Sequence, residues 1–237
     1  MIEFSTKYRS KQAEIMDDLQ FKGNEMKDVL TDLKCVNKLL GGNSITIDGI
    51  RKLLKGKPKD RTYTILDIGC GDGEMLRKCA QFGIANGFKF QLIGIDANLF
   101  ILEEARLRSR DFQNISYNKI DVFSNDIKEV DYDIALCTLF LHHFKTSEVT
   151  QIMNNLVSSA KVGAVVNDLQ RNRLAFLLFR LFSLLFLKTK IAKHDGLVSV
   201  ARGFLRKEIE SIAKEINASK SQLHWKWAFR YQWILIR

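Results

Sequence analysis

The feature that most constrains the fold is a regular alternation of short apolar segments and longer amphipathic ones between residues 62 and 169. Five segments predict strands: 62–69, 89–96, 115–121, 132–140 and 162–169. Segments with helical spacing of apolar residues separate them, at 74–87, 98–111 and 147–160. Strands that alternate with helices of this length predict βαβ units, with a mostly parallel sheet covered by helices on both faces.

The flanking segments add helices and one more pair of strands. Helical spacing predicts helices over 10–40, 47–54 and 206–216, and residues 222–237 predict two closely joined antiparallel strands at the sheet edge. We therefore expect a Rossmann-like α/β sheet of seven strands, mostly parallel with an antiparallel edge strand. Residues 1–60 would form an N-terminal helical cap on a main domain at 61–237, which carries a helical insertion at about 170–205, after the fifth strand.

A glycine-rich turn, ILDIGCGDGEML (65–76), follows the first strand. Ligands of open α/β sheets bind beyond the carboxyl ends of the strands, where glycine allows a backbone to come close. The spacing Gly69-x-Gly71-x-Gly73 differs from the dinucleotide pattern GxGxxG, because Glu74 stands where a third small residue is needed. A carboxylate there would repel a pyrophosphate at the helix N-terminus. This argues against NAD, and the P-loop pattern is also absent.

Acidic residues stand at the ends of successive strands. Asp67 precedes the glycines, Asp96 ends the second strand and Asp121 with Val122 follows the third. In doubly wound folds, an acid at the position of Asp96 binds ribose hydroxyls. A carboxylate or backbone group at 121–122 can contact an adenine amine. Together these positions predict a nucleoside site.

The motifs LDIGCGDGEML, Asp96, NKIDVF and YDIALCTLFLHHF closely resemble those of class I S-adenosylmethionine-dependent methyltransferases, over about residues 60–170. The resemblance implies that S-adenosylmethionine is the cofactor and S-adenosylhomocysteine the product. It implies a methionine site at the turn of Asp67, Gly69, Cys70, Gly71 and Gly73, a ribose site at Asp96 and Ala97, an adenine site at Asp121 and Val122, and Cys137 beside the sulfonium. One departure is Val162, where many small-molecule members have proline.

The scarcity of proline excludes two kinds of nucleic-acid methyltransferase. Pro58 is the single proline, so the chain contains neither Asn/Asp-Pro-Pro-Tyr nor the Pro-Cys nucleophile of cytosine-C5 enzymes. No DNA partner is expected, and RNA methylation by another route stays an alternative.

The flanking segments resemble a bacterial subgroup similar to quinone and polyketide methyltransferases. That resemblance implies an O or C nucleophile on a hydrophobic phenol, quinone or polyketide-like molecule.

Residues 174–187, LAFLLFRLFSLLFL, are almost entirely apolar but too short to span a bilayer. They lie within the basic stretch 171–206, which holds eight Lys or Arg residues and one acid, in a chain with net charge +10. One interpretation is a lid over a hydrophobic substrate that also touches a membrane surface through these bases. The alternative is a core helix or a homodimer contact.

Three histidines are candidate catalytic residues. His142 and His143 follow the fourth strand, and His194 lies in the insertion; an imidazole there can take a proton from a phenol. Alternatively, they line or cap the pocket without transferring protons. A separate alternative is that the whole chain is a non-catalytic cofactor-binding or membrane-associated protein. The four cysteines lack CxxC spacing, so we expect no metal site, no disulfide framework and a cytoplasmic location.

Overall fold

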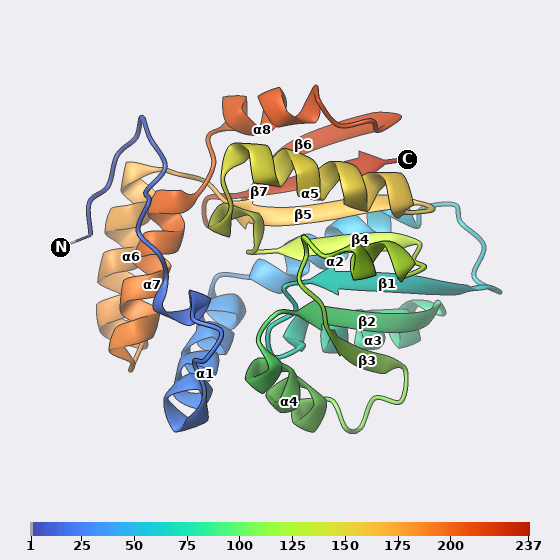
Figure 1. The fold of residues 1–237 in the computed structure, drawn as a ribbon, viewed down its shortest axis with the longest axis horizontal. Coiled ribbons are helices and arrows are strands. Elements are labelled where there is room, and N and C mark those ends of the chain that lie inside the picture. Colours follow the sequence, from blue (N-terminus) through green and yellow to red (C-terminus); the bar gives the residue numbers. More distant parts are fainter. Residues whose placement is uncertain (1) are drawn as a thin grey trace.

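A seven-stranded sheet forms the centre of the computed structural model, which describes residues 2–237 (Figure 1). The strands are β1 (Thr62–Ile68), β2 (Lys89–Asp96), β3 (Ile115–Lys119), β4 (Ile134–Thr138), β5 (Gly163–Leu169), β6 (Lys220–Lys226) and β7 (Arg230–Ile236). Their order is β3-β2-β1-β4-β5-β7-β6. Strands β1 to β5 are parallel, and β7 pairs antiparallel with both β5 and β6. The Rossmann-like sheet predicted from the sequence is confirmed.

Helices cover both faces of the sheet. One face packs against α2 (Gly42–Leu53), α3 (Glu74–Asn86) and α4 (Leu99–Arg108), and the other against α5 (Thr146–Ser159) and α8 (Arg206–Ala213). Figure 1 shows α5 in front of the sheet and α3 behind it. The central strands β1 and β4 are therefore buried on both sides, which explains their nearly continuous apolar sequences.

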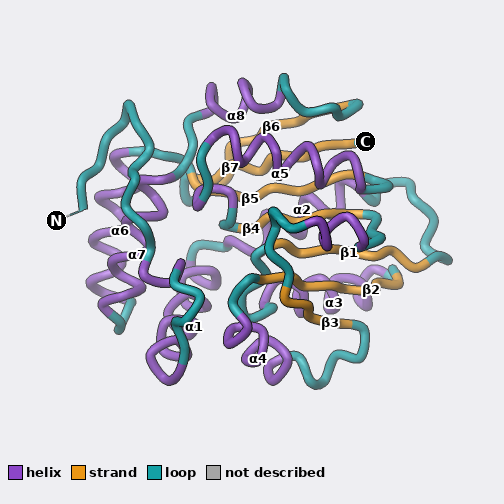
Figure 2. The backbone as a smooth tube through the Cα atoms, in the orientation of Figure 1, coloured by secondary structure: helices purple, strands orange, loops and turns teal. Residues whose placement is uncertain are grey.

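A third group of helices lies beyond the carboxyl ends of the parallel strands. It consists of α1 (Gly23–Leu39), α6 (Arg173–Phe186) and α7 (Lys190–Arg202), at the left of Figure 2. Val29 of α1 forms one apolar cluster with Leu187 and with Ile191 of α7. The helices that follow β5 thus pack with the N-terminal helix beside the sheet edge where ligands bind in such folds.

Helix α6 is apolar on two opposite faces. Phe179 and Phe182 pack inward against the cluster of α1 and α7. The outward side chains are 49% to 69% exposed: Leu174, Leu177, Leu178, Leu181, Leu184, Leu185 and Phe186. Among residues 2–237, no helix has both the length and the apolar character needed to cross a bilayer.

The N-terminal segment differs from its predicted structure. Residues 10–22 are not α-helical: they contain a short 3-10 helix, η1 (Ile15–Asp17), and α1 begins only at Gly23, whose φ is +81°. The reason is that this segment bonds to distant elements, since the Ile15 and Met16 amides donate to the Asp195 carboxylate of α7. Helix α2 begins at Gly42 instead of residue 47, and β3 and β4 end two residues before the predicted positions.

Candidate functional site

The glycine turn between β1 and α3 has a backbone that other residues would disturb. Gly69 and Gly73 have φ values of +64° and +76°. A Cβ atom on Gly69 would lie 2.2 Å from the Phe140 ring, and one on Gly73 would lie 1.9 Å from the Tyr117 hydroxyl. Glycine is therefore required at both positions, as the sequence pattern predicts. Gly71, with φ +52°, completes the turn.

Two carboxylates lie at this turn in different surroundings. Asp96 accepts hydrogen bonds from the Gly71 amide (3.1 Å) and the Asn98 amide (3.0 Å), so it ties the turn to the end of β2. Asp67 is only 2% exposed, and its carboxylate accepts no hydrogen bond from the described part of the chain. Burial, together with the charge of Asp96, raises the pKa of Asp67 to about 8. A positively charged group of a ligand would supply the missing partner.

The remaining predicted cofactor positions lie at the same sheet edge. The Ile120 amide donates to the Asp96 carbonyl at 3.2 Å, so Asp121 and Val122 continue beside the end of β2. Val122 is buried and Asp121 is exposed. Ala97, directly after β2, is half-buried, whereas Cys70 and Cys137 are buried, and burial raises the pKa of both thiols well above the usual range.

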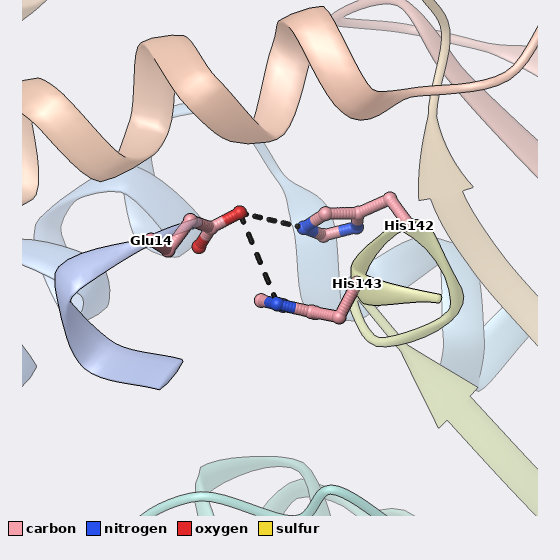
Figure 3. A group of neighbouring side chains, drawn as sticks. All are labelled: Glu14, His142 and His143. Atoms are coloured by element: carbon pink, nitrogen blue, oxygen red, sulfur yellow. Dashed lines mark ion pairs between the residues drawn. The ribbon is translucent and has the colours of Figure 1, made fainter. Parts of the chain in front are cut away.

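His142 is held between two carboxylates. It belongs to the short 3-10 helix η3 (Leu141–His143) after β4, and its side chain is 2% exposed. Its Nδ1 lies 2.7 Å from Asp168 Oδ1, and its Nε2 lies 3.4 Å from Glu14 Oε1 (Figure 3). Burial lowers the pKa of His142, but the charges and hydrogen bonds of Asp168 and Glu14 outweigh it and raise that pKa to about 9. His142 is therefore an imidazolium at neutral pH.

His143 has a different environment. Its Nδ1 lies 2.7 Å from Asp17 Oδ1 and 4.0 Å from Glu14 Oε1, and its side chain is partly exposed. Burial opposes ionisation of Asp17, but the bond and charge of His143 hold the pKa of Asp17 at about 2. The imidazole ring is 6.4 Å from the ring of Phe140, which covers Gly69. His143 thus lies between the N-terminal segment and the glycine turn.

Glu14, His142 and His143 also have the composition of a metal site. Within residues 2–237 they form a group whose potential ligand atoms all lie within 4.8 Å of one another, and Figure 3 shows Glu14 facing both rings. A metal ion would need His142 neutral, whereas the two carboxylates on either side of its ring favour the protonated form. Ion pairing therefore accounts for the contacts of His142.

Two arginines from distant segments hold η3 in place. Arg9 donates to the carbonyls of His142 and Phe144, both at 2.8 Å. Arg202, the last residue of α7, donates to the His142 carbonyl at 3.1 Å and to the His143 carbonyl, and it pairs with Asp17 at 3.0 Å. The histidine pair is therefore fixed jointly by the N-terminal segment and α7.

His194 does not join the histidine pair. Its Nδ1 lies 2.8 Å from Asp195 Oδ1, and its side chain is 37% exposed. Asp195 also accepts the amides of Ile15 and Met16, so His194 is linked to the N-terminal turn only through Asp195. Sequence reasoning did not identify the polar residues that surround the histidines: Arg9, Glu14, Asp17, Asp168 and Arg202. The available signal was the position of Asp168 near the end of a predicted strand.

Comparisons with known proteins agree with this geometry. Residues 65–163 match the family model described as "Methyltransferase domain". A search of curated protein sequences found no match. Among solved structures, the chain is similar to a magnesium protoporphyrin IX methyltransferase from Synechocystis PCC 6803 with bound SAH, with TM-score 0.52, 16% identity and coverage of 96% of this chain and 90% of that one.

Two further structures are similar over most of their length. The plantazolicin methyltransferase BpumL, in complex with a desmethyl analogue and SAH, has TM-score 0.63 and 14% identity, with 87% of this chain and 90% of that one covered. A SAM-dependent methyltransferase from Aquifex aeolicus has TM-score 0.60 and 14% identity, with 91% and 99% covered. At these identities the structures establish a shared fold.

The sheet order and the glycine turn are those expected of class I S-adenosylmethionine-dependent methyltransferases, and residues 65–163 match a methyltransferase domain. The chain is therefore an enzyme, and its methyltransferase domain includes residues 65–163. The cofactor predicted from the sequence, S-adenosylmethionine, is confirmed, as its product SAH is bound in similar structures.

Proposed function

We propose that the enzyme methylates an O or C nucleophile of a hydrophobic small molecule, such as a phenol, quinone or polyketide-like compound. The observation that carries the cofactor part is the buried, unpartnered Asp67 beside the anchored Asp96. Similarity to a magnesium protoporphyrin IX methyltransferase and a plantazolicin methyltransferase supports a small-molecule acceptor. The four cysteines are all free thiols, in keeping with a cytoplasmic location.

The cofactor site in this proposal follows the strand ends. Asp67 and the turn Gly69, Cys70, Gly71 and Gly73 hold the methionine part, where the carboxylate attracts positive charge. Asp96 and Ala97 contact the ribose, Asp121 and Val122 the adenine, and Cys137 lies behind the sulfonium. When bound, S-adenosylmethionine supplies an electrophilic methyl group. The chain contributes the orientation of the two reactants and the exclusion of water.

His143 is the better placed of the three histidines to act as a general base. It is partly exposed, its ring lies 6.4 Å from the ring of Phe140 over the glycine turn, and its Nδ1 lies 2.7 Å from Asp17 Oδ1. His142 already carries a proton at neutral pH, and His194 lies with Asp195 on α7. In this proposal His142 is a fixed positive charge and His194 a peripheral residue.

Cofactor binding is the first test. The native chain should bind S-adenosylmethionine in titration calorimetry, and Asp96→Ala should weaken binding at least about tenfold, because it removes both the ribose contact and the bond to Gly71. Asp131→Ala is the matched control, since that carboxylate is surface-exposed. Absence of binding by the native chain would show that the assignment of the cofactor site is wrong.

The acceptor is tested separately. Methyl transfer to phenols and lipid quinones should be detected, whereas short RNAs should not bind even at low salt, where phosphate contacts are strongest. Salt-sensitive RNA binding together with RNA methylation would replace the small-molecule proposal with the RNA alternative.

The outer face of α6 supports a peripheral membrane contact. Residues 172–194 include five basic residues, Arg173, Arg180, Lys188, Lys190 and Lys193, and no acid. A second copy of the chain on this face would bring like charges together, whereas anionic lipid would neutralise them. We therefore favour an anionic membrane surface over a homodimer as the partner of the exposed leucines of α6.

A further inference from the structure

A buried arginine lies at the carboxyl edge of the sheet, away from the glycine turn. Arg230 begins β7 and pairs with Leu169 at the end of β5; its side chain is 2% exposed. Its Nε and Nη1 have no hydrogen-bond partner in the described chain. Burial lowers its pKa to about 10, so the guanidinium is still charged at neutral pH. A buried charge without a bonded partner is costly, which indicates that a partner is missing.

Arg171, at the same edge, differs from Arg230 in having an ion pair, although its Nε also lacks a hydrogen-bond partner among the described residues. It is also buried, but its Nη1 donates to the Gly203 carbonyl at 2.7 Å and its Nη2 to Glu208 at 2.6 Å. Among the described residues Arg230 forms no ion pair, and the nearby charge of Asp168 only partly offsets the effect of burial on its pKa. The lack of an ion pair indicates that Arg230 binds a ligand, whereas Arg171 stabilises the fold.

The N-terminus of α2 meets the Arg230 guanidinium. A Cβ atom on Gly42, the first residue of α2, would lie 2.5 Å from Arg230 Nη1 and 2.9 Å from Asn37 Oδ1, so a larger residue would displace these side chains. The preceding Gly41 offers no side-chain cap, and the amides of Gly42 and Asn43 have no partner within residues 2–237. Free amides and the helix dipole attract anions, independently of the arginine.

We propose that Arg230 and the N-terminus of α2 bind a carboxylate of the methyl acceptor. This inference rests on the proposed function and narrows its substrate class. A planar guanidinium matches a carboxylate with two parallel hydrogen bonds, and the helix amides provide further donors.

The sheet order sets the length of the acceptor. Strand β7 is two places from β4, whose end at Cys137 lies beside the proposed methyl donor. Neighbouring strands are about 5 Å apart, so the carboxylate would bind about 10 Å from the methylated atom. The acceptor is therefore an extended hydrophobic acid, with its nucleophile and its carboxylate at opposite ends.

The experiment compares an acid with its neutral amide. The probes are 4-hydroxycinnamate and 4-hydroxycinnamamide, titrated into the full chain saturated with S-adenosylhomocysteine. The native chain should bind the acid at least about tenfold more tightly than the amide. Arg230→Gln should abolish this preference and Arg230→Lys should retain part of it, while the affinity for S-adenosylhomocysteine is unchanged.

Gly42→Ala tests the helix terminus with the arginine retained, and it should weaken acid binding because the new methyl group displaces the guanidinium. Equal affinities of the native chain for acid and amide would overturn the inference, and that comparison needs no variant to fold. Unchanged acid binding in a folded Arg230→Gln would also overturn it. Loss of S-adenosylhomocysteine binding by the native chain would instead count against the proposed function.

Discussion

The ionisation of the Asp67 carboxyl should depend on whether the cofactor is bound. It is buried without a hydrogen-bond donor and lies close enough to Asp96 for the two charges to interact, so its carboxyl is mainly protonated at neutral pH. A cationic group of S-adenosylmethionine would favour the ionised form. Cofactor binding should therefore release the proton of Asp67.

The linkage of protons to binding follows from this carboxyl. At pH 6.5, well below its pKa of about 8, binding of S-adenosylmethionine should release about one proton, so affinity should rise with pH until about pH 8. Calorimetry in buffers of different ionisation enthalpy measures the number released. Asp67→Asn should remove the release; equal proton release in this variant would assign it to another group.

His142 and His143 are adjacent in sequence but differ in burial and in the carboxylates that lie beside them. His142 is enclosed by Asp168 and Glu14, whereas His143 faces Asp17 and is partly exposed. The sequence alone makes the two residues equivalent candidates. Asp168 of β5 and the N-terminal segment, which brings Glu14 and Asp17, distinguish them.

The proposed base can be separated from its neighbours by kinetics. His143→Ala should lower kcat about 10²-fold or more for a phenolic acceptor, with the Kd of S-adenosylmethionine unchanged. Asp17→Asn should lower kcat less and shift the pH profile, because it acts through the imidazole. His194→Ala is the control, and a larger loss there than in His143→Ala would contradict the assignment.

At the scale of elements, the parts predicted correctly are those encoded by local periodicity. The strands β1 to β5 and helices α3 to α5 follow from the spacing of their own apolar residues, and the cofactor edge follows from their order. Residues 10–22 were predicted as helix but bond to α7 and η3, and no local pattern shows that Arg9 reaches the carbonyl of residue 142. The polar surroundings of the histidines depend on such long-range contacts.

Loss of His142 should destabilise the packing of η3 against β5 and the N-terminal segment. His142→Gln leaves Asp168 and Glu14 buried without their cation, at a cost of about 3–5 kcal/mol in the free energy of unfolding. In the native chain the raised pKa of His142 contributes stability that is complete below about pH 6.5 and declines as pH rises towards 9. Urea titrations at several pH values measure this decline, which His142→Gln should lack and the exposed control His224→Gln should keep.

At the scale of the whole molecule, α6 lies at the end of the protein beyond the strand termini (Figure 1). Its outward apolar side chains are exposed. Leu181→Glu with Leu185→Glu should abolish co-sedimentation with vesicles that contain phosphatidylglycerol, and neutral vesicles should bind weakly. Ile84→Glu on α3, at an 82% exposed position, is the matched control. The native chain could instead fail to co-sediment with anionic vesicles and form a dimer, with the double variant monomeric. That result would show that a second copy covers this face.

The position of β7 has a consequence for synthesis of the chain. Strand β7 lies inside the sheet, between β5 and β6, although it follows both in sequence. While the ribosome is still producing residues 230–236, the fully formed β5 would expose one unpaired edge, and unpaired edges invite association between nascent chains. We expect this enzyme to depend on chaperones until β7 has been inserted between β5 and β6.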